Sequence, residues 1–180
     1  MLALGVALGS CGGGDGSTET VDTAALEREA EREADVATLN QILGRQRAAV
    51  AAIDRTLASM RGRNRALALR LRIQEEEHTV AILEALRDLD GSEEVTAEEI
   101  ASGPLRSEAE RLTFLYEIES ATIEDELAAI ASLDSASART VLASTVANQA
   151  QHLVLLRRAL GAKPDEWVPA AFEDGATPAQ

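Results

Sequence analysis

Glu75 and His78 are the residues whose types and spacing are best suited to metal or proton chemistry. They are three positions apart, so on a helix both side chains project from one face. Leu71, Ile82 and Leu86 continue that face as an apolar stripe. Burying a carboxylate and an imidazole in such a stripe costs free energy unless the two groups are paired or hold a metal ion. The spacing therefore predicts either a buried hydrogen-bonded pair or half of a metal site.

Four apolar stripes with helical spacing predict the elements that must position this pair. They lie in residues 35–60, 64–89, 107–133 and 137–160. The mostly charged stretch 23–34 has high helix propensity and is expected to form an exposed lead-in of a turn or two. The second stripe contains Glu75 and His78, the third contains Glu119, and the fourth contains His152.

Several residues mark the predicted ends of these helices. Asn64 is expected to cap the second helix, and Gly91 to end it with left-handed backbone. Capping boxes at 96–99 and 107–110 predict a short helical segment and the start of the third helix. Gly161 is expected to stop the fourth helix.

The lengths of the connections predict the topology. Short turns join the first helix to the second and the third to the fourth, which gives two antiparallel hairpins. The middle connection, residues 90–106, could reach about 55 Å when extended, enough to travel the length of a bundle. We therefore expect an all-α fold, a four-helix bundle of two hairpins joined by one long crossover.

The two hairpins repeat one pattern of buried polar residues. Glu75 and His78 correspond to Gln149 and His152 at an offset of 74 residues, and Gln46 corresponds to Glu119 at nearly the same offset. Two similar hairpins would bring these side chains to one level of the core. The predicted polar set is Gln46, Glu75, His78, Glu119, Gln149 and His152.

With this pattern, residues 35–175 resemble the ferritin-like domain family, in particular small bacterial ferritin-like lipoproteins. The resemblance implies a di-iron site in which each helix supplies a glutamate and the second and fourth helices each add a histidine. Glu75, His78, Glu119 and His152 match that ligand set, whereas Gln46 and Gln149 stand where glutamates belong.

The two amides change the expected chemistry. Glu75 and Glu119 can neutralise only one divalent cation, and a neutral amide bridges two metals poorly. The remaining set, Glu75, Glu119, His78 and His152, suits one Fe, Mn or Zn ion. A metal-free hydrogen-bond network is the alternative for the same residues. A working di-iron oxidase is the least favoured interpretation, and no catalytic residue is assigned.

The N-terminus suggests a location. Residues 1–10 form an uncharged apolar run that ends in small residues before Cys11, the single cysteine. This pattern resembles the lipobox of bacterial lipoproteins, in which residues 1–10 would be a signal peptide and Cys11 would carry the lipid. Residues 11–22 would then be a flexible tether that holds the bundle, residues 23–162, at the extracytoplasmic face of the cell membrane.

Composition limits the partners. Hydrophobic residues make up 46% of the 180 residues and aromatic residues 2%, a balance that favours helices. The formal net charge is −14, which argues against nucleic acid as a partner. The tail, residues 163–180, contains Trp167 and Phe172 and is expected to pack on one end of the bundle. The sequence thus predicts a membrane-tethered ferritin-like module that binds one metal ion, or a metal-free interaction bundle with an unidentified protein partner or a second copy of itself.

Overall fold

The computed structural model describes residues 22–95 and 99–167, and within them it is built from helices alone. The four long helices are followed by one short 3₁₀ helix. Their bounds are α1 Thr23–Leu57, α2 Gly62–Asp88, α3 Glu108–Ser132, α4 Ala136–Ala159 and η1 Pro164–Glu166. The predicted all-α architecture is confirmed.

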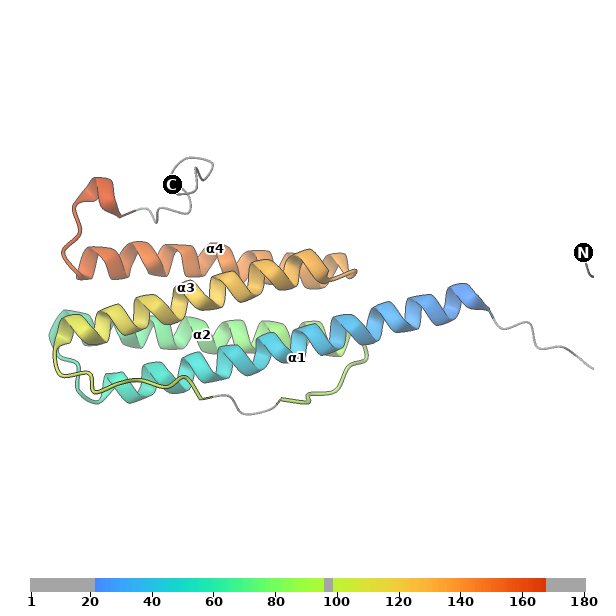
Figure 1. The fold of residues 1–180 in the computed structure, drawn as a ribbon, viewed down its shortest axis with the longest axis horizontal. Coiled ribbons are helices and arrows are strands. Elements are labelled where there is room, and N and C mark those ends of the chain that lie inside the picture. The colour runs from blue at the N-terminus through green and yellow to red at the C-terminus, as the bar shows by residue number, and fades with distance from the viewer. Residues whose placement is uncertain (1–21, 96–98, 168–180) are drawn as a thin grey trace, which may run out of the picture.

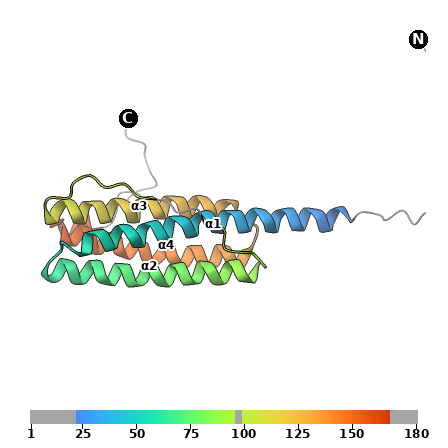
Figure 2. The same cartoon turned by 90° about the horizontal axis from the view of Figure 1, so that it is seen from below.

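The helices form the two expected hairpins. α1 packs mainly on α2 and α3, and α4 packs mainly on α3 and α2, so the hairpins α1–α2 and α3–α4 lie against each other. Figures 1 and 2 show the four helices running side by side, with the crossover returning along the bundle to the start of α3. Ile100 and Leu105 of the crossover pack on Phe114 and Ile118 of α3 and on alanines of α1. The crossover therefore covers the side of the bundle that α1 and α3 form.

Two apolar clusters occupy the ends of the core. One contains Leu43, Ile82 and Leu142, and the other contains Leu71 and Leu156, all of them fully buried. Burying each such side chain stabilises the fold by about 2 kcal/mol. The predicted polar residues lie between the two clusters in every helix, so the apolar ends hold a polar layer in the middle of the bundle.

The predicted end of α2 at Gly91 is wrong in its detail. Asp90, not Gly91, takes the left-handed backbone, with φ of 52°. Gly91 N then donates to Leu86 O at 2.8 Å. Gly91 is required for space instead, because a Cβ there would lie 2.7 Å from a methyl group of Val36. At the end of α4 the expectation holds, since Gly161 has φ of 90°.

The starts of the helices give mixed outcomes. The prediction of Asn64 as an N-cap is wrong, because α2 begins at Gly62 with Arg61 as its cap residue. Met60, in the short connection between α1 and α2, is fully buried. The capping box of Ser107 and Glu110 is confirmed at the start of α3. The predicted box at 96–99 lies largely outside the described residues.

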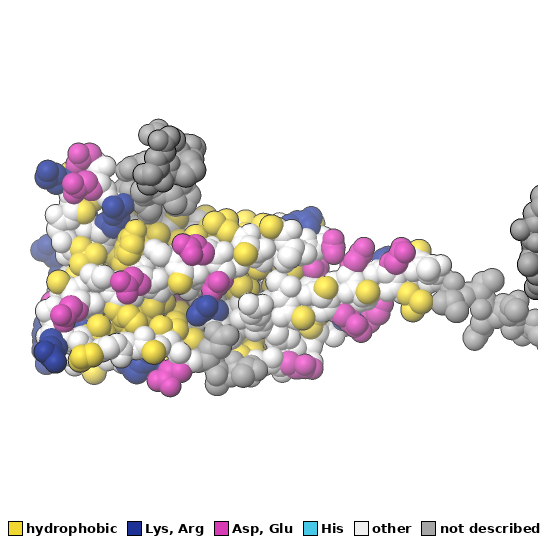
Figure 3. All heavy atoms as spheres, in the orientation of Figure 1, with side chains coloured by type: hydrophobic (Ala, Val, Ile, Leu, Met, Phe, Trp, Pro, Cys, Tyr) yellow, Lys and Arg dark blue, Asp and Glu magenta, His cyan; other side chains and the backbone are white. Residues whose placement is uncertain are grey.

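The charged lead-in is part of α1 itself rather than a separate turn. α1 runs for 35 residues, and its N-terminal part projects beyond the bundle as a single rod (Figure 1). Arg32 ties the base of this overhang to the bundle by donating to Leu89 O at 2.7 Å. Figure 3 shows acidic side chains gathered along the overhang.

The ends of the chain bear on the predicted anchor and tail. Residues 1–21, with Cys11, lie outside the described residues, as does Phe172. Trp167 lies just after η1, donates from Nε1 to Ala162 O at 2.8 Å and stacks on the guanidinium of Arg158. Across the described residues, no helix has the length and apolar character needed to span a bilayer.

Candidate metal centre

All six polar residues predicted from the sequence are buried in the layer between the apolar clusters. α1 contributes one residue, α2 two, α3 one and α4 two. They are Gln46, Glu75, His78, Glu119, Gln149 and His152. The structure divides them, together with two residues that the sequence analysis did not select, into two groups of different chemistry.

The first group, the histidine cluster, consists of Glu75, His78, Glu119 and His152. Nδ1 of His152 lies 3.1 Å from Oε2 of Glu119 and 3.2 Å from Oε1 of Glu75. One ring nitrogen therefore faces two carboxylates that come from different helices. The ligand atoms of Glu75, Glu119 and His152 all lie within 4.8 Å of one another, and all three residues are buried.

His78 belongs to the same cluster but stands beside the three-residue group. Its Nδ1 lies 3.3 Å from Oε2 of Glu75, so Glu75 contacts both histidines. The rings of His78 and His152 are nearly parallel, with an interplanar angle of 21° and centroids 6.1 Å apart. His78 therefore contributes mainly by holding Glu75 in its ionised form.

The charges of the histidine cluster follow from these contacts. Burial opposes ionisation of Glu75, but hydrogen bonds from His152 and His78 outweigh it and lower its pKa to about 2. Burial likewise opposes protonation of His152, yet its bonds to Glu119 and Glu75 raise its pKa to about 9. Burial and the charge of Glu75 raise the pKa of Glu119 to about 7. Without a metal, an imidazolium therefore lies between the two carboxyl groups at neutral pH.

The second group, the amide cluster, is centred on Glu126, which the sequence analysis missed. Gln46 Nε2 donates to Oε1 of Glu126 at 2.7 Å, and Thr145 Oγ1 lies 2.5 Å from its Oε2. Gln149 Nε2 is 3.5 Å from the same Oε1. Glu126, Gln46, Gln149 and Thr145 together place one carboxyl group among neutral partners.

The hydroxyl of Thr145 lies between Glu126 and the backbone of its own helix. It is 2.8 Å from the backbone oxygen of Leu142, and its one hydrogen can go to only one of these two acceptors at a time. Burial raises the pKa of Glu126 to about 7, against the opposing hydrogen bonds from Thr145 and Gln46. Glu126 therefore keeps its proton to a higher pH than an exposed glutamate does.

Glu126 was not selected from the sequence because the stripe of α3 can be continued by a step of either three or four residues. In the sequence, Leu127, four residues after Ile123, is the apolar continuation of the α3 stripe. In the structure Leu127 is 50% exposed and Glu126 is 0% exposed. A step of three would have reached Glu126, which lies seven residues after Glu119 and therefore on the same face. The seven-residue spacing between Glu119 and Glu126 was the sequence pattern that could have identified Glu126.

Gln149 connects the two clusters. Its Nε2 lies 3.4 Å from Oε2 of Glu75 as well as 3.5 Å from Glu126. The two amides that replace the implied glutamates thus act as hydrogen-bond donors to carboxylates in this structure.

The donor set fits one metal ion. Two buried oxygens of the layer, Oε1 of Gln46 and Oε1 of Gln149, have no hydrogen-bond partner, and Oε1 of Glu75 has only its ion pair with Nδ1 of His152. Lone pairs left over in a buried layer suit a cation. Ligands bound at about 2.1 Å in a tetrahedral site lie about 3.4 Å apart, close to the 3.1 and 3.2 Å between Nδ1 of His152 and its two carboxylates. The mixed nitrogen and oxygen ligands match Zn, Mn or Fe.

Solved structures with the same arrangement of helices support this interpretation of the fold. A structure described as ferritin-like, diiron-carboxylate proteins from Bacillus anthracis str. Ames superposes with a TM-score of 0.59 at 17% identity, covering 72% of this chain and 97% of that one. The fold is ferritin-like. A conserved hypothetical protein from Mycobacterium tuberculosis gives 0.58 at 18% identity, with 74% and 95% coverage. Neither protein-family models nor curated proteins match the sequence.

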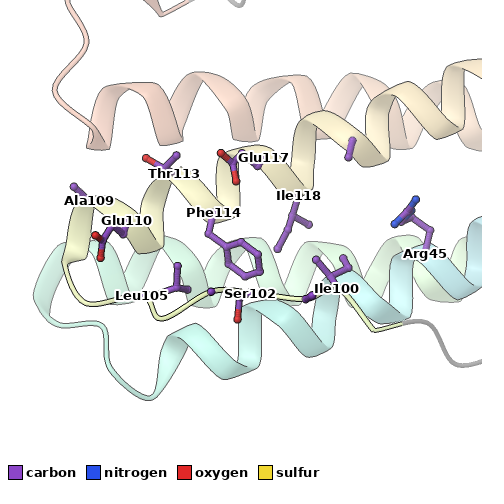
Figure 4. Close-up of a pocket in the computed structure, with 13 residues that line it drawn as sticks. Arg45, Ile100, Ser102, Leu105, Ala109, Glu110, Thr113, Phe114, Glu117 and Ile118 are labelled. Carbon is purple, nitrogen blue, oxygen red and sulfur yellow. The ribbon is translucent and has the colours of Figure 1, made fainter.

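A groove on the described surface lies away from this polar layer. It has a volume of about 580 Å³ and runs between the crossover and α3, lined by Leu105, Phe114 and Ile118 among others. Figure 4 shows Phe114 and Ile118 pointing from α3 toward the crossover. No member of either cluster lines it, so the ferritin-like fold places its candidate chemistry in the buried layer and not in this groove.

Proposed function

We propose that this protein is a ferritin-like module that binds one divalent metal ion through Glu75, Glu119 and His152. The observation that carries the proposal is the convergence of three buried ligand atoms, from α2, α3 and α4, within 4.8 Å of one another. Exposed acidic groups come together on many surfaces, but buried carboxylates beside an imidazole are costly and seldom accidental.

The charge of the histidine cluster supports a single ion. Glu75 and Glu119 carry two negative charges when ionised, and His152 is a neutral ligand through Nδ1. Binding would replace the proton on that nitrogen, so uptake should release protons and strengthen as pH rises. A bound ion would supply Lewis acidity or, if it is Fe or Mn, one-electron redox chemistry.

The amide cluster argues against a di-iron oxidase. Such a site needs four carboxylates around two ions, whereas here Gln46 and Gln149 are neutral and donate hydrogen bonds. Glu126 adds a third carboxyl group to the layer, but it is engaged by Thr145 and Gln46. Because the partners of Glu126 are neutral, Glu126 alone could not neutralise a second divalent ion.

The alternative is a metal-free bundle that serves as a structural or interaction module. The hydrogen bonds of the amide cluster favour it, since they satisfy Glu126 without any ion, and an imidazolium between Glu75 and Glu119 could do the same for the histidine cluster. In that case the polar layer fixes the register of the helices, and the function lies in an acidic surface with an unknown protein partner.

Metal analysis separates these two functions. Protein purified without chelators should contain close to one equivalent of Zn, Mn or Fe, and metal-stripped protein should take up one equivalent of Zn or Co. Less than about a tenth of an equivalent after reconstitution would leave the metal-free bundle as the function.

We further propose that the bundle is anchored outside the cytoplasm through a lipid on Cys11. The support is the apolar run at residues 1–10, the small residues before Cys11 and the glycine-rich stretch after it. Cys11→Ser expressed from the complete gene should move the protein from the membrane to the soluble fraction and remove the lipid mass from the chain. Membrane association that survives the substitution would contradict the anchor.

A further inference from the structure

Gln74 makes a contact that neither the repeat nor the ligand pattern predicted. It precedes Glu75 on α2 and is half-buried, and its Oε1 lies 3.0 Å from Nε2 of His152. The outer side of Gln74 lines a shallow surface groove together with Leu69 and Ile73. Gln74 therefore extends from the solvent-facing side of α2 to the back of the buried imidazole.

This contact decides which ring nitrogen faces the carboxylates. An amide oxygen can only accept, so Nε2 of His152 must carry a hydrogen and donate it to Gln74. Nδ1 is then the nitrogen that remains for Glu75 and Glu119, at 3.2 and 3.1 Å. A ring turned by 180° about its Cβ–Cγ bond would place carbon atoms where these nitrogens now lie.

Other contacts do not fix the ring in this way. Stacking on His78 restrains the plane of the ring but not the direction of its nitrogens. The two carboxylates of the histidine cluster would attract whichever nitrogen reached them. Among the described residues, Gln74 is the hydrogen-bond acceptor for Nε2, on the side of the ring away from the carboxylates.

We infer that Gln74 is a positioning residue that holds His152 with Nδ1 directed at the metal position. The inference rests on the proposed function for its effect on metal binding, but the hydrogen bond itself exists without a metal. Residues that accept the second N–H of a metal-binding histidine typically change metal affinity by about 10- to 100-fold when they are removed. An effect of that size is expected here.

The first measurement needs no metal. His78 and His152 are the only histidines of the chain, so ¹⁵N-labelled imidazoles give two sets of signals, and a His78→Gln variant assigns them. Metal-free protein should show a slowly exchanging Nε2–H for His152. Gln74→Leu keeps the bulk of the side chain but removes the acceptor, and should abolish that signal. Gln74→Glu restores an acceptor and should retain it.

The second measurement is the affinity for Zn or Co. It should fall about 10- to 100-fold in Gln74→Leu and recover in Gln74→Glu. Gln151→Leu is the matched control, because Gln151 is exposed on α4 and its amide contacts only the backbone oxygen of Ala147 in the described contacts. That variant should keep both the Nε2–H signal and the affinity.

The outcomes are separable. An Nε2–H signal of His152 that is absent from the parent protein, or unchanged in Gln74→Leu, would overturn the inference. So would a lost signal with unchanged affinity, since Gln74 would then bond the ring without positioning it for metal. If no variant binds metal, the proposed function fails, and the metal-free spectra still decide whether Gln74 orients His152.

Discussion

The histidine cluster and the amide cluster lie next to each other in one polar layer, yet Glu75 of the first and Glu126 of the second differ in charge. Glu75 faces two imidazoles and stays ionised, with a pKa of about 2. Glu126 faces two amides and a hydroxyl, and burial raises its pKa to about 7. Both side chains are almost fully inaccessible to solvent. The comparison teaches that the partners, rather than the exposed fraction, decide whether these two buried glutamates are ionised at neutral pH.

The largest expected effect comes from removing the shared carboxylate of the histidine cluster. Glu75→Ala leaves His78 and His152 without their common partner and should lower the free energy of unfolding by about 3–5 kcal/mol, as is usual when one member of a buried ion pair is lost. Urea unfolding at pH 7 measures this. The control is Glu76→Ala, whose exposed ion pair with Arg72 should be worth less than about 1 kcal/mol. Equal losses in the two variants would mean that the cluster is not an ion pair.

Exchanging one carboxyl group in each cluster tests which of them holds metal. Glu119→Gln removes a ligand and should weaken Zn or Co binding by more than about 100-fold, since loss of a supporting residue alone costs 10- to 100-fold. Glu126→Gln should leave the affinity and the stoichiometry unchanged. Titration calorimetry on metal-stripped protein measures both. A loss of affinity in Glu126→Gln would place the ion between the clusters instead of within the histidine cluster.

The pH dependence of stability should distinguish the clusters as well. Burial raises the folded pKa of Glu126 from 4.5 to about 7, so between these values the folded protein binds more protons than the unfolded chain. Stability must then fall as pH rises through that range. Glu126→Gln mimics the protonated acid and should stabilise metal-free protein at pH 8 by about 1–3 kcal/mol.

The measurement for this prediction is the difference in unfolding free energy between Glu126→Gln and the parent protein at pH 4.5, 6 and 8. The difference should grow with pH, because only the parent protein retains the titrating carboxyl group. A constant difference at all three pH values would show that folding does not raise the pKa of Glu126.

The smallest effect concerns the hydroxyl of the amide cluster. Thr145→Val keeps the shape of the side chain but leaves Oε2 of Glu126 without its partner, which should cost about 1–2 kcal/mol. Thr140→Val on the same helix is the control, because Thr140 is exposed and bonds only the backbone oxygen of Ala136 in the described contacts. Thermal unfolding of the two variants should separate them. Similar melting temperatures would mean that water replaces the hydroxyl.

The sequence was sufficient for the arrangement of the helices because each carries a strong apolar stripe and the connections differ sharply in length. Helix ends were less predictable, since they depend on contacts between distant residues. Gly91 illustrates this, because its need for space comes from Val36, which lies 55 positions earlier in the chain. The connection before α2 likewise contains the fully buried Met60, whose burial no local turn pattern indicates.

The candidate site was predictable only in part, for a related reason. The repeat identified residues at corresponding heights, and the structure brings all six of them into one layer. Glu126 has no equivalent in the first hairpin, and Leu127 beside it offered a more apolar continuation of the stripe. Gln74 was also beyond prediction, since its role depends on the orientation of the His152 ring. The repeat between the two hairpins identifies the candidate ligands, but the residues that contact those ligands need not occur in both hairpins.

The overhang of α1 has a mechanical consequence. From Thr23 to Gln46 the helix rises about 35 Å, and Arg32 fastens its projecting part to the bundle. Because α1 is one continuous helix, a force applied at its first turn would be transmitted to the polar layer without an intervening hinge. If Cys11 carries the proposed lipid, this rod places about 35 Å of helix between the first turn of α1 and the polar layer.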